Sequence, residues 1–244
     1  MIEIRALTEH SEFQEAVRLQ REIWGFADTD LLPARLFVVA TKVGGHALGA
    51  FDSGRMIGFC LAIPGLKPGG QYYLHSHMLG ILPEYRNTGI GRMLKLEQRR
   101  DALARGIDLI EWTFDPLEIK NAYFNIERLG AIARRYLPNQ YGTTSSRLHG
   151  GLPTDRLVAE WWLASPRVQA IVSGAPFQRP LPEARIAVPS TIGELRIEDP
   201  PRARQLQFET GEQFKRHFAA GLVVIGFEKS PERGTYLLGR WEFG

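Results

Sequence analysis

The sequence predicts an α/β protein, with a mixed central β-sheet carrying helices on both faces and a small C-terminal α/β extension. Three observations support this fold class. Strand-like and helix-like patterns alternate along residues 1–165, a glycine turn joins a long strand pattern to a helix, and a Pro-, Ser- and Gly-rich segment follows. We therefore expect one domain over residues 1–165, and a linker with a smaller second unit over residues 166–244.

The N-terminal part begins with a strand and two helices. Residues 2–7 alternate between apolar and polar side chains, as a strand does. Thr8 is the expected cap of an amphipathic helix over residues 12–24, and a second helix is expected over residues 33–42.

Three strands follow. Residues 47–52 and 56–63 flank Ser53-Gly54-Arg55, which is typical of a hairpin turn because Gly54 can adopt a positive φ. Residues 72–82 then form a long apolar-rich segment that we interpret as a central strand.

The elements after the glycine turn complete the predicted sheet. Apolar positions predict the buried face of a helix that ends near Gly106: Ile90, Met93, Leu94, Leu96 and Leu103. A strand over residues 107–114, a helix over 119–129 closed by Gly130, and strands over 131–137 and 157–163 follow.

The C-terminal part is expected to be a separate appendage. Residues 165–190 are predicted to be a linker, residues 200–220 a helix, and residues 222–228 with 235–241 a hairpin. No phosphate loop or metal-ligand spacing is found in this part of the sequence. Its expected role is structural or that of a lid over a substrate.

Composition narrows the classes of function. Of the 244 residues 44% are hydrophobic and 23% are charged, and the net charge of +3 comes without a lysine- or arginine-rich run, so a small anionic ligand is favoured over nucleic acid. The apolar runs are short and residues 1–12 are charged, which predicts a cytoplasmic protein without a membrane span. Cys60, the only cysteine, is expected to be a small buried hydrophobic residue.

The glycine turn at residues 86–91 has the pattern RxxGxG and is interpreted as a phosphate-binding turn. A helix that begins directly after such a turn presents its first backbone N–H groups to an anion, and glycines let a ligand approach the backbone. The spacing differs from Rossmann and Walker loops, because neither a third Gly nor a Gly-Lys-Ser/Thr ending is present. A plain glycine-rich connection between strand and helix is the alternative.

With the predicted order of elements, the run LGILPEYRNTGIG over residues 79–91 resembles the GNAT superfamily of CoA-dependent N-acyltransferases, and the resemblance covers residues 1–165. In that family the RxxGxG turn binds the pyrophosphate of acetyl-CoA and the preceding strand contacts its pantetheine arm. The resemblance therefore implies acetyl-CoA or another short acyl-CoA as cosubstrate, with no metal. It assigns cofactor contacts to Leu79, Ile81, Arg86, Asn87, Thr88, Gly89, Ile90, Gly91, Arg92 and Asn125.

The segment 121–130 resembles the family's second CoA-binding element but departs from it at one position. Aligned on Leu129 and Gly130, Ile126 occupies the place of the family's usual tyrosine, which protonates the departing thiolate. Tyr123 lies three residues earlier, on nearly the same face of a regular helix, and is our candidate for this acid. Tyr141 is the second candidate, and a purely structural aromatic is the alternative for Tyr123.

His75 and His77 alternate on the central strand, so we expect both imidazoles on one face of the sheet. They resemble the paired histidines of arylalkylamine N-acetyltransferases, which imply a base relay. An imidazole can accept the proton that a primary amine must lose before it attacks a thioester. Satisfied polar groups or aromatic packing are the alternative, and no third residue at metal-site spacing suggests zinc. A backbone N–H near Ile81 is expected to stabilise the oxyanion.

The predicted function is transfer of an acetyl or related short acyl group, succinyl included, to a primary amine of a small molecule such as an amino acid. Asp115 could bind the substrate's ammonium group or simply form the turn before Pro116. The chain looks like a bacterial GNAT subgroup with a C-terminal extension, and a homodimer is compatible with it. Two alternatives remain open: a non-catalytic CoA-binding regulator and a protein lysine acetyltransferase.

Overall fold

A computed structural model describes residues 1–142 and 152–242. The helices are α1 (His10–Trp24), α2 (Ala34–Lys42), α3 (Ile90–Ala104), α4 (Ile119–Tyr123), α5 (Pro166–Ser173), α6 (Ile192–Glu198) and α7 (Pro200–Ala219). The strands are β1 (Ile2–Ala6), β2 (His46–Asp52), β3 (Arg55–Leu66), β4 (Tyr72–Ile81), β5 (Leu109–Phe114), β6 (Ile132–Leu137), β7 (Arg156–Trp162), β8 (Ala184–Pro189), β9 (Val223–Lys229) and β10 (Arg233–Gly239). Short 3₁₀ turns span Asp28–Asp30 and Pro83–Tyr85, and a π-helical turn spans Phe124–Arg128.

The described residues form two compact units, one over residues 1–111 and one over residues 112–142 and 152–242. Strand β5 begins in the first unit and ends in the second. The domain boundary expected near residue 165 is a different kind of boundary, because it marks where the resemblance to the GNAT superfamily ends. The division into compact units does not test it, and it stays a prediction.

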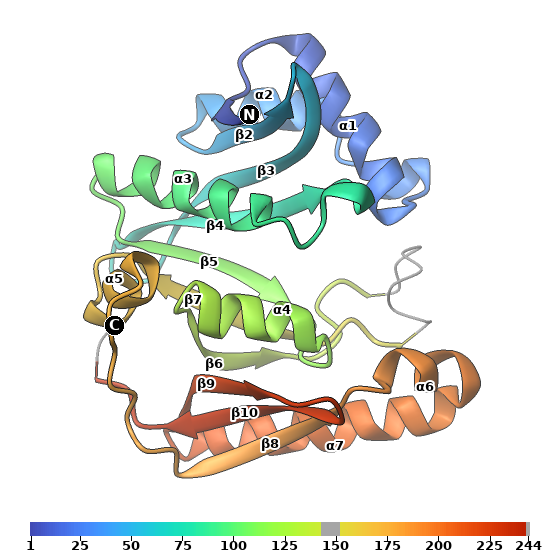
Figure 1. Ribbon diagram of the computed structural model, residues 1–244, viewed down its shortest axis with the longest axis vertical. Coiled ribbons are helices and arrows are strands. Elements are labelled where there is room, and N and C mark those ends of the chain that lie inside the picture. The colour runs from blue at the N-terminus through green and yellow to red at the C-terminus, as the bar shows by residue number, and fades with distance from the viewer. Residues whose placement is uncertain (143–151, 243–244) are drawn as a thin grey trace. The chain divides into compact units, whose positions relative to one another are not determined.

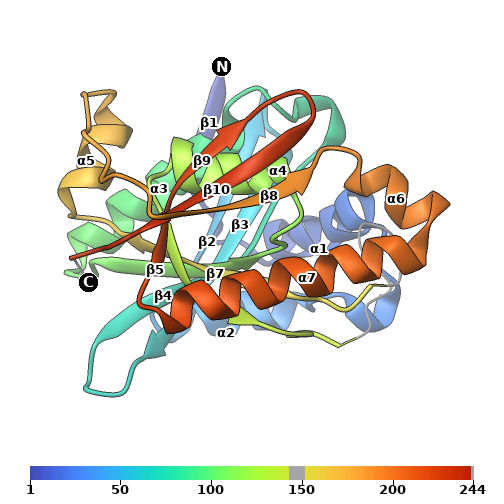
Figure 2. The ribbon, with the colours of Figure 1, turned by 90° about the horizontal axis from the view of Figure 1, so that it is seen from below.

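The first unit contains a mixed sheet in the order β1-β2-β3-β4-β5. Strands β1 to β4 are antiparallel neighbours, whereas β5 runs parallel to β4. Figures 1 and 2 show α3 on one side of these strands and α1 with α2 on the other. The expected mixed sheet with helices on both faces is therefore confirmed in this unit.

The core of the first unit joins the apolar faces of α1, α2 and α3 to β2 and β3, and includes Phe13, Phe37, Phe59 and Leu94. Cys60 is fully buried among them, as expected, and its burial raises the pKa of the thiol to about 12. Two details of the predicted helices are wrong. The N-cap of α1 is Glu9 instead of Thr8. Met93, which was expected on the buried face of α3, is 40% exposed, because that face includes Lys95 and Gln98 instead.

The second unit has the strand order β7-β6-β9-β10-β8, with antiparallel neighbours. Figures 1 and 2 show α4 and α7 on opposite faces of these strands. On the α7 side, Phe214 packs edge to face against Tyr236, with ring centroids 5.0 Å apart. The predicted C-terminal helix and hairpin are confirmed as α7, β9 and β10.

The linker expected over residues 165–190 is wrong, because these residues form α5 and β8. Ser165 caps α5 by accepting a hydrogen bond from the Val168 N–H at 3.3 Å, and Gly174 ends the helix in the left-handed conformation. Strand β8 pairs with β10, and only residues 174–183 between α5 and β8 lack regular secondary structure. Helix α6 was not predicted.

Candidate active site

Strand β4 carries the two candidate histidines at an irregular point. Ser76 pairs with Ala62 of β3 and Met78 pairs with Leu61, so His77 is the extra residue of a β-bulge. The ring centroids of His75 and His77 lie 5.9 Å apart, so the two imidazoles do come together. Regular alternation predicts both rings on one face of the strand, and they lie close together although the register of β4 shifts between them.

Both imidazoles favour the neutral form. Desolvation and the neighbouring His77 lower the pKa of His75 to about 4, against the opposing effect of the Glu111 carboxylate. Desolvation also lowers the pKa of His77, whose side chain nevertheless reaches solvent. Both imidazoles are therefore neutral at pH 7, as a proton acceptor must be, and the exposed His77 is the more accessible of the two to an amine.

Glu111 of β5 is the register partner of His75 in the parallel pair of β4 and β5. Its carboxylate is buried and forms an ion pair with Lys67, with Nζ 2.5 Å from Oε1. Lys67 follows the end of β3, in the turn that leads into β4. The Glu111 carboxylate therefore acts on His75 while it is paired with Lys67, and neither charged residue was identified from the sequence.

A second polar cluster lies between β4 and α3. The Lys95 ammonium donates a hydrogen bond to the Ser76 hydroxyl at 2.8 Å, and that hydroxyl donates to Gln98 Oε1 at 3.1 Å. All three side chains are buried. Desolvation lowers the pKa of Lys95 to about 7. This cluster fixes the strand at the residue between the two histidines.

The glycine turn leads from β4 into α3 as predicted. Gly89 is the N-cap of α3 with a φ of 91°, and Asn87 also has a positive φ of 64°. The Thr88 hydroxyl donates to the Tyr85 carbonyl at 2.6 Å. A Cβ added at Gly89 would meet open space. The entrance of this 15-residue helix is thus open to an approaching anion, which is the geometry of a phosphate site.

The remaining predicted cofactor contacts in and around the turn differ in their exposure and in their hydrogen bonds. Arg86 is exposed, yet its guanidinium donates to the backbone carbonyls of Ile81 and Ile23 at 3.3 and 3.2 Å, so it also holds the turn against the sheet. Asn87, Thr88 and Gly89 are exposed. The other predicted cofactor contacts in this region are half-buried, namely Leu79, Ile81, Gly91 and Arg92, whereas Ile90 is buried.

In the second unit, the helix expected over 119–129 is α4 followed by a π-helical turn. Leu129 N–H donates to the Phe124 carbonyl at 3.1 Å, which is the wider hydrogen bond of a π turn. Ile126 is fully buried while Tyr123 is 38% exposed, so the expectation that they share a face is wrong. Tyr123 stays our predicted acid only because its exposed side chain can be reached by a ligand.

Three further predicted residues of this unit have protein partners. Asn125 is buried and its side-chain oxygen accepts a hydrogen bond from the Trp112 indole at 3.2 Å. The Tyr141 hydroxyl lies 2.8 Å from the Thr113 hydroxyl. The Asp115 carboxylate accepts a hydrogen bond from the Leu117 N–H at 2.8 Å and forms an ion pair with Arg196 at 2.7 Å. These contacts favour the interpretation of Asp115 as a turn residue over that of an ammonium-binding residue.

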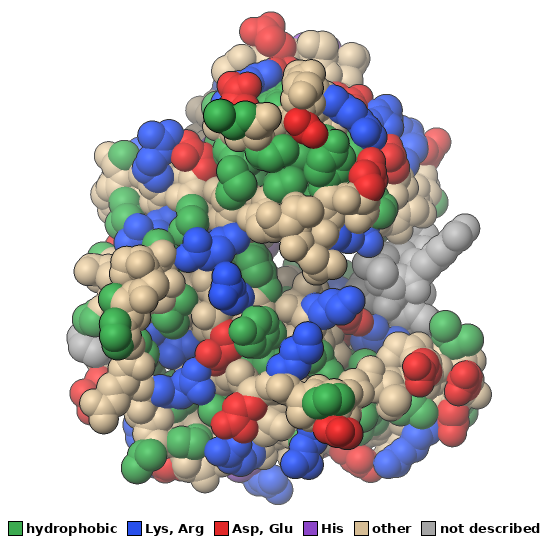
Figure 3. All heavy atoms as spheres, viewed as in Figure 1, with side chains coloured by type: hydrophobic (Ala, Val, Ile, Leu, Met, Phe, Trp, Pro, Cys, Tyr) green, Lys and Arg blue, Asp and Glu red, His purple; other side chains and the backbone are tan. Residues whose placement is uncertain are grey.

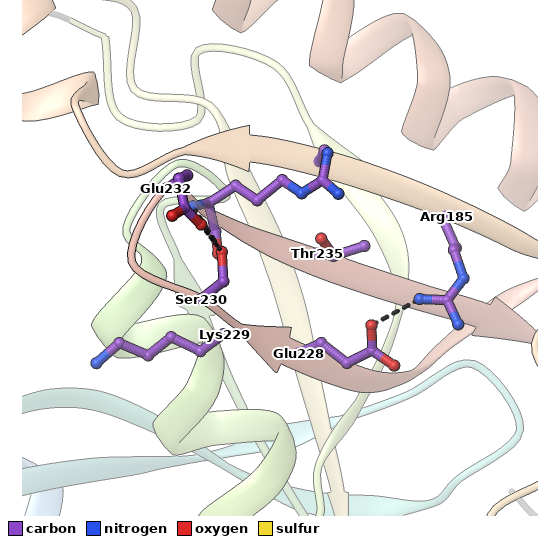
Figure 4. A pocket seen from close by; sticks show the side chains of 8 residues that line it. Arg185, Glu228, Lys229, Ser230, Glu232 and Thr235 are labelled. Carbon is purple, nitrogen blue, oxygen red and sulfur yellow. Dashed lines mark hydrogen bonds and ion pairs between the residues drawn. The ribbon is translucent and has the colours of Figure 1, made fainter.

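A depression of about 720 Å³ lies over β8, β9 and β10 in the second unit (Figure 4). Both of its acidic side chains have partners there, since Arg185 contacts Glu228 at 2.6 Å and the Ser230 hydroxyl donates to Glu232 at 2.9 Å. On the face drawn in Figure 3, basic and acidic side chains are also interspersed. These surfaces present mixed charge.

None of the helices among the described residues is long and apolar enough to cross a membrane. Within residues 1–142 and 152–242, no group of three or more His, Cys, Asp or Glu side chains could hold a metal ion.

Residues 10–130 match the model of the acetyltransferase (GNAT) family, a range that includes both histidines and the glycine turn. The chain belongs to this family and is an N-acetyltransferase. No curated relative matches the chain.

Solved structures share the fold. The ribosomal-protein-S18-alanine N-acetyltransferase of Escherichia coli matches with a TM-score of 0.54 and 16% identity, over 68% of this chain and 96% of that one. Aminoglycoside 6'-acetyltransferase type Ii matches with a TM-score of 0.53 and 20% identity, over 67% and 98%. The putative acetyltransferase yncA of Salmonella typhimurium, solved with acetyl-CoA, matches with a TM-score of 0.54 and 14% identity. The match covers 68% of this chain and 95% of that one.

Proposed function

We propose that this acetyltransferase moves an acetyl or related short acyl group, succinyl included, from acyl-CoA to the primary amine of a small molecule such as an amino acid. The observation that carries the proposal is the continuity of β4, the turn and α3. One strand presents two neutral imidazoles and leads directly into an open helix N-terminus whose N-cap is a glycine. In this proposal one continuous stretch of chain supplies both the base and the anion site.

The residues of the turn fit the pyrophosphate of acyl-CoA. The first N–H groups of a helix generally lack carbonyl partners within it, and the helix dipole adds to their attraction for an anion. In α3 the Arg92 N–H already donates to the Gly89 carbonyl at 3.0 Å, so the anion would be bound by the N–H groups before it. Gly89 leaves space in front of them. Arg86 and Arg92 would add cationic donors, and Leu79 and Ile81 an apolar strand edge for the pantetheine arm. A structure containing acetyl-CoA, that of yncA, has the same fold.

When bound, acyl-CoA supplies an activated thioester. His77, the more exposed of the two imidazoles, accepts the proton that the amine loses, and His75 supports it from the adjacent position. A backbone N–H near Ile81 stabilises the negative charge that develops on the thioester oxygen. Tyr123 donates a proton to the departing thiolate, with Tyr141 as the second candidate.

A thiol-release assay tests this function. The purified chain is given acetyl-CoA or succinyl-CoA and a panel of amines that includes free amino acids, small polyamines and lysine-containing peptides. We expect turnover with at least one small amine and weaker turnover with peptides. Saturable CoA binding without turnover of any amine would favour the regulator, and turnover restricted to peptides would favour a protein acetyltransferase.

A further inference from the structure

The buried polar cluster of Ser76, Lys95 and Gln98 lowers the stability of the fold that contains it. Lys95 is 3% exposed, and desolvation lowers the pKa of its ammonium to about 7. Gln98 is fully buried, and its Nε2 group donates no hydrogen bond to any described residue. Burial of a charge or of an unsatisfied donor is unfavourable, so an apolar contact between α3 and β4 would be more stable. Stability alone therefore does not account for the cluster.

The cluster contacts β4 at the residue between the two candidate histidines. The Ser76 hydroxyl accepts a hydrogen bond from Lys95 Nζ at 2.8 Å and donates one to Gln98 Oε1 at 3.1 Å. Lys95 and Gln98 are three residues apart in α3, so they lie on the same face of that helix. The helix thus holds one strand residue through two hydrogen bonds, and that residue has His75 on one side and His77 on the other.

The pairing of β4 with β3 is irregular at the same place. The register shifts between the pair Ala62–Ser76 and the pair Leu61–Met78, with His77 as the extra residue. A bulge disrupts the ladder of interstrand hydrogen bonds locally. The hydrogen bonds of Ser76 to α3 supply a second constraint on the strand where the ladder is disrupted.

We propose that the cluster of Ser76, Lys95 and Gln98 positions the two imidazoles by fixing the backbone of β4 between them. The Ser76 side chain is directed to α3, so the cluster acts on the imidazoles through the strand. A displacement of about 1 Å in a reacting group can lower a rate by about a hundredfold, so a small shift of the strand would matter. The consequence for catalysis rests on the proposed role of the histidines, whereas the placement of their rings does not.

Steady-state kinetics of the full-length chain test the role of the hydroxyl. The substrates are acetyl-CoA and whichever amine of the panel is turned over, so the class of acceptor does not affect the result. Ser76→Ala should lower kcat about tenfold or more and leave the KM for acetyl-CoA unchanged, because the shift affects the imidazoles. Ser76→Thr keeps the hydroxyl and should restore kcat. Thr41→Val removes a half-buried hydroxyl that bonds to the Phe37 carbonyl within α2, and as the matched control it should leave kcat unchanged.

Lys95→Met separates positioning from stability. The variant lacks the buried ammonium, so it should unfold at a higher urea concentration than wild type at pH 7 while its kcat falls as in Ser76→Ala. A less active but more stable chain is not expected of a residue with a merely structural role. An unchanged kcat in both variants would overturn the proposal, as would a loss of activity that accompanies a loss of stability. A raised KM for acetyl-CoA at unchanged kcat would assign the cluster to cofactor binding and overturn it as well.

NMR of the full-length chain without substrate measures the placement of the rings apart from catalysis. Gln98→Leu changes no charge and should shift the ring resonances of His75 and His77, which are assigned by their loss in His75→Gln and His77→Gln. Gln20→Leu removes a buried amide that bonds to the Leu32 backbone, and as the matched control it should leave these resonances unchanged. Unshifted rings in Gln98→Leu would overturn the proposal. Shifted rings together with full activity of His77→Ala would retain the positioning cluster and reject the proposed base.

Discussion

At the scale of single residues, the catalytic proposal depends on imidazoles that are neutral at physiological pH. His75 and His77 were identified from their spacing before the glycine turn, and the structure brings their rings to 5.9 Å. Their lowered pKa values have a physical cause that the sequence does not display, since desolvation depends on what packs around each ring.

Replacing the exposed histidine tests the base directly. His77→Ala should lower kcat by ~10² or more and remove the acidic limb of the pH profile, because a positioned general base contributes about that factor. In wild type this limb should lie below pH 6.5, since the pKa of His77 is lowered. The exposed His10 in α1 provides the matched control, His10→Ala. A pH profile for His77→Ala that coincides with wild type would remove His77 from this role.

The lowered pKa of the buried Lys95 predicts how the free energy of unfolding depends on pH. Its pKa is about 7 in the folded chain and about 10.4 when unfolded, so between these values the unfolded state binds more protons. The free energy of unfolding should therefore rise as pH increases from 7 to 9, by roughly 2 kcal/mol from this residue at about 1.4 kcal/mol per pKa unit.

Lys95→Met keeps the volume of the side chain and should remove that rise, so the variant should be more stable than wild type at pH 7. Urea unfolding at pH 7 and pH 9 measures the difference. Equal pH dependence in both proteins would show that burial does not depress the pKa of Lys95 in solution.

At the scale of elements, the β4-turn-α3 stretch was predicted nearly residue by residue, because its signals are local. Gly89 sits where a positive φ is required, and Ile90 and Leu94 repeat at helical spacing on the buried face. The helix after β5 was predicted less well. Its π-helical turn at Phe124–Arg128 changes which residues face the core. No residue type in this segment predicts a π-helical turn.

A side chain at the glycine N-cap should obstruct the phosphate site. Gly89→Val should weaken acyl-CoA binding at least tenfold, as measured by isothermal titration calorimetry, because the new side chain would enter the space in front of the helix. Gly54→Val is the matched control, since Gly54 has a similar positive φ of 84° and open space around it in the β2–β3 turn. Equal affinity in the two variants would argue against a phosphate site at the turn.

At the scale of the whole molecule, the C-terminal residues are part of a packed unit. Val223 and Ile225 form a buried cluster with Ile132 of β6. The Glu127 carboxylate accepts hydrogen bonds from Arg179 and from the Phe227 N–H, each at 2.7 Å. Residues 166–242 therefore complete the core around β6 and the π-helical turn, which supports a structural role for them over that of a removable lid.

Truncation after Ser165 should yield a chain that does not fold cooperatively. It would expose Ile132 to solvent and leave the Glu127 carboxylate without these partners, which is costly for a partly buried charge. Circular dichroism during thermal unfolding, with the full-length chain in parallel, measures the effect. A truncated chain that melts cooperatively near the full-length temperature, with unchanged activity on small amines, would support the lid instead.

The sequence alone determined the features that depend on near neighbours along the chain: the alternating elements, the Ser53-Gly54 hairpin, the glycine turn before α3 and the pair of histidines. Each is encoded by residue type at short spacing, where backbone sterics and periodicity act. Only the tertiary structure decided which groups face the histidines. Glu111 and Lys67 are 44 residues apart, and Lys95 reaches Ser76 from another element, so their charges and desolvation arise from packing. The bulge at His77 likewise comes from pairing with β3, which no local pattern specifies.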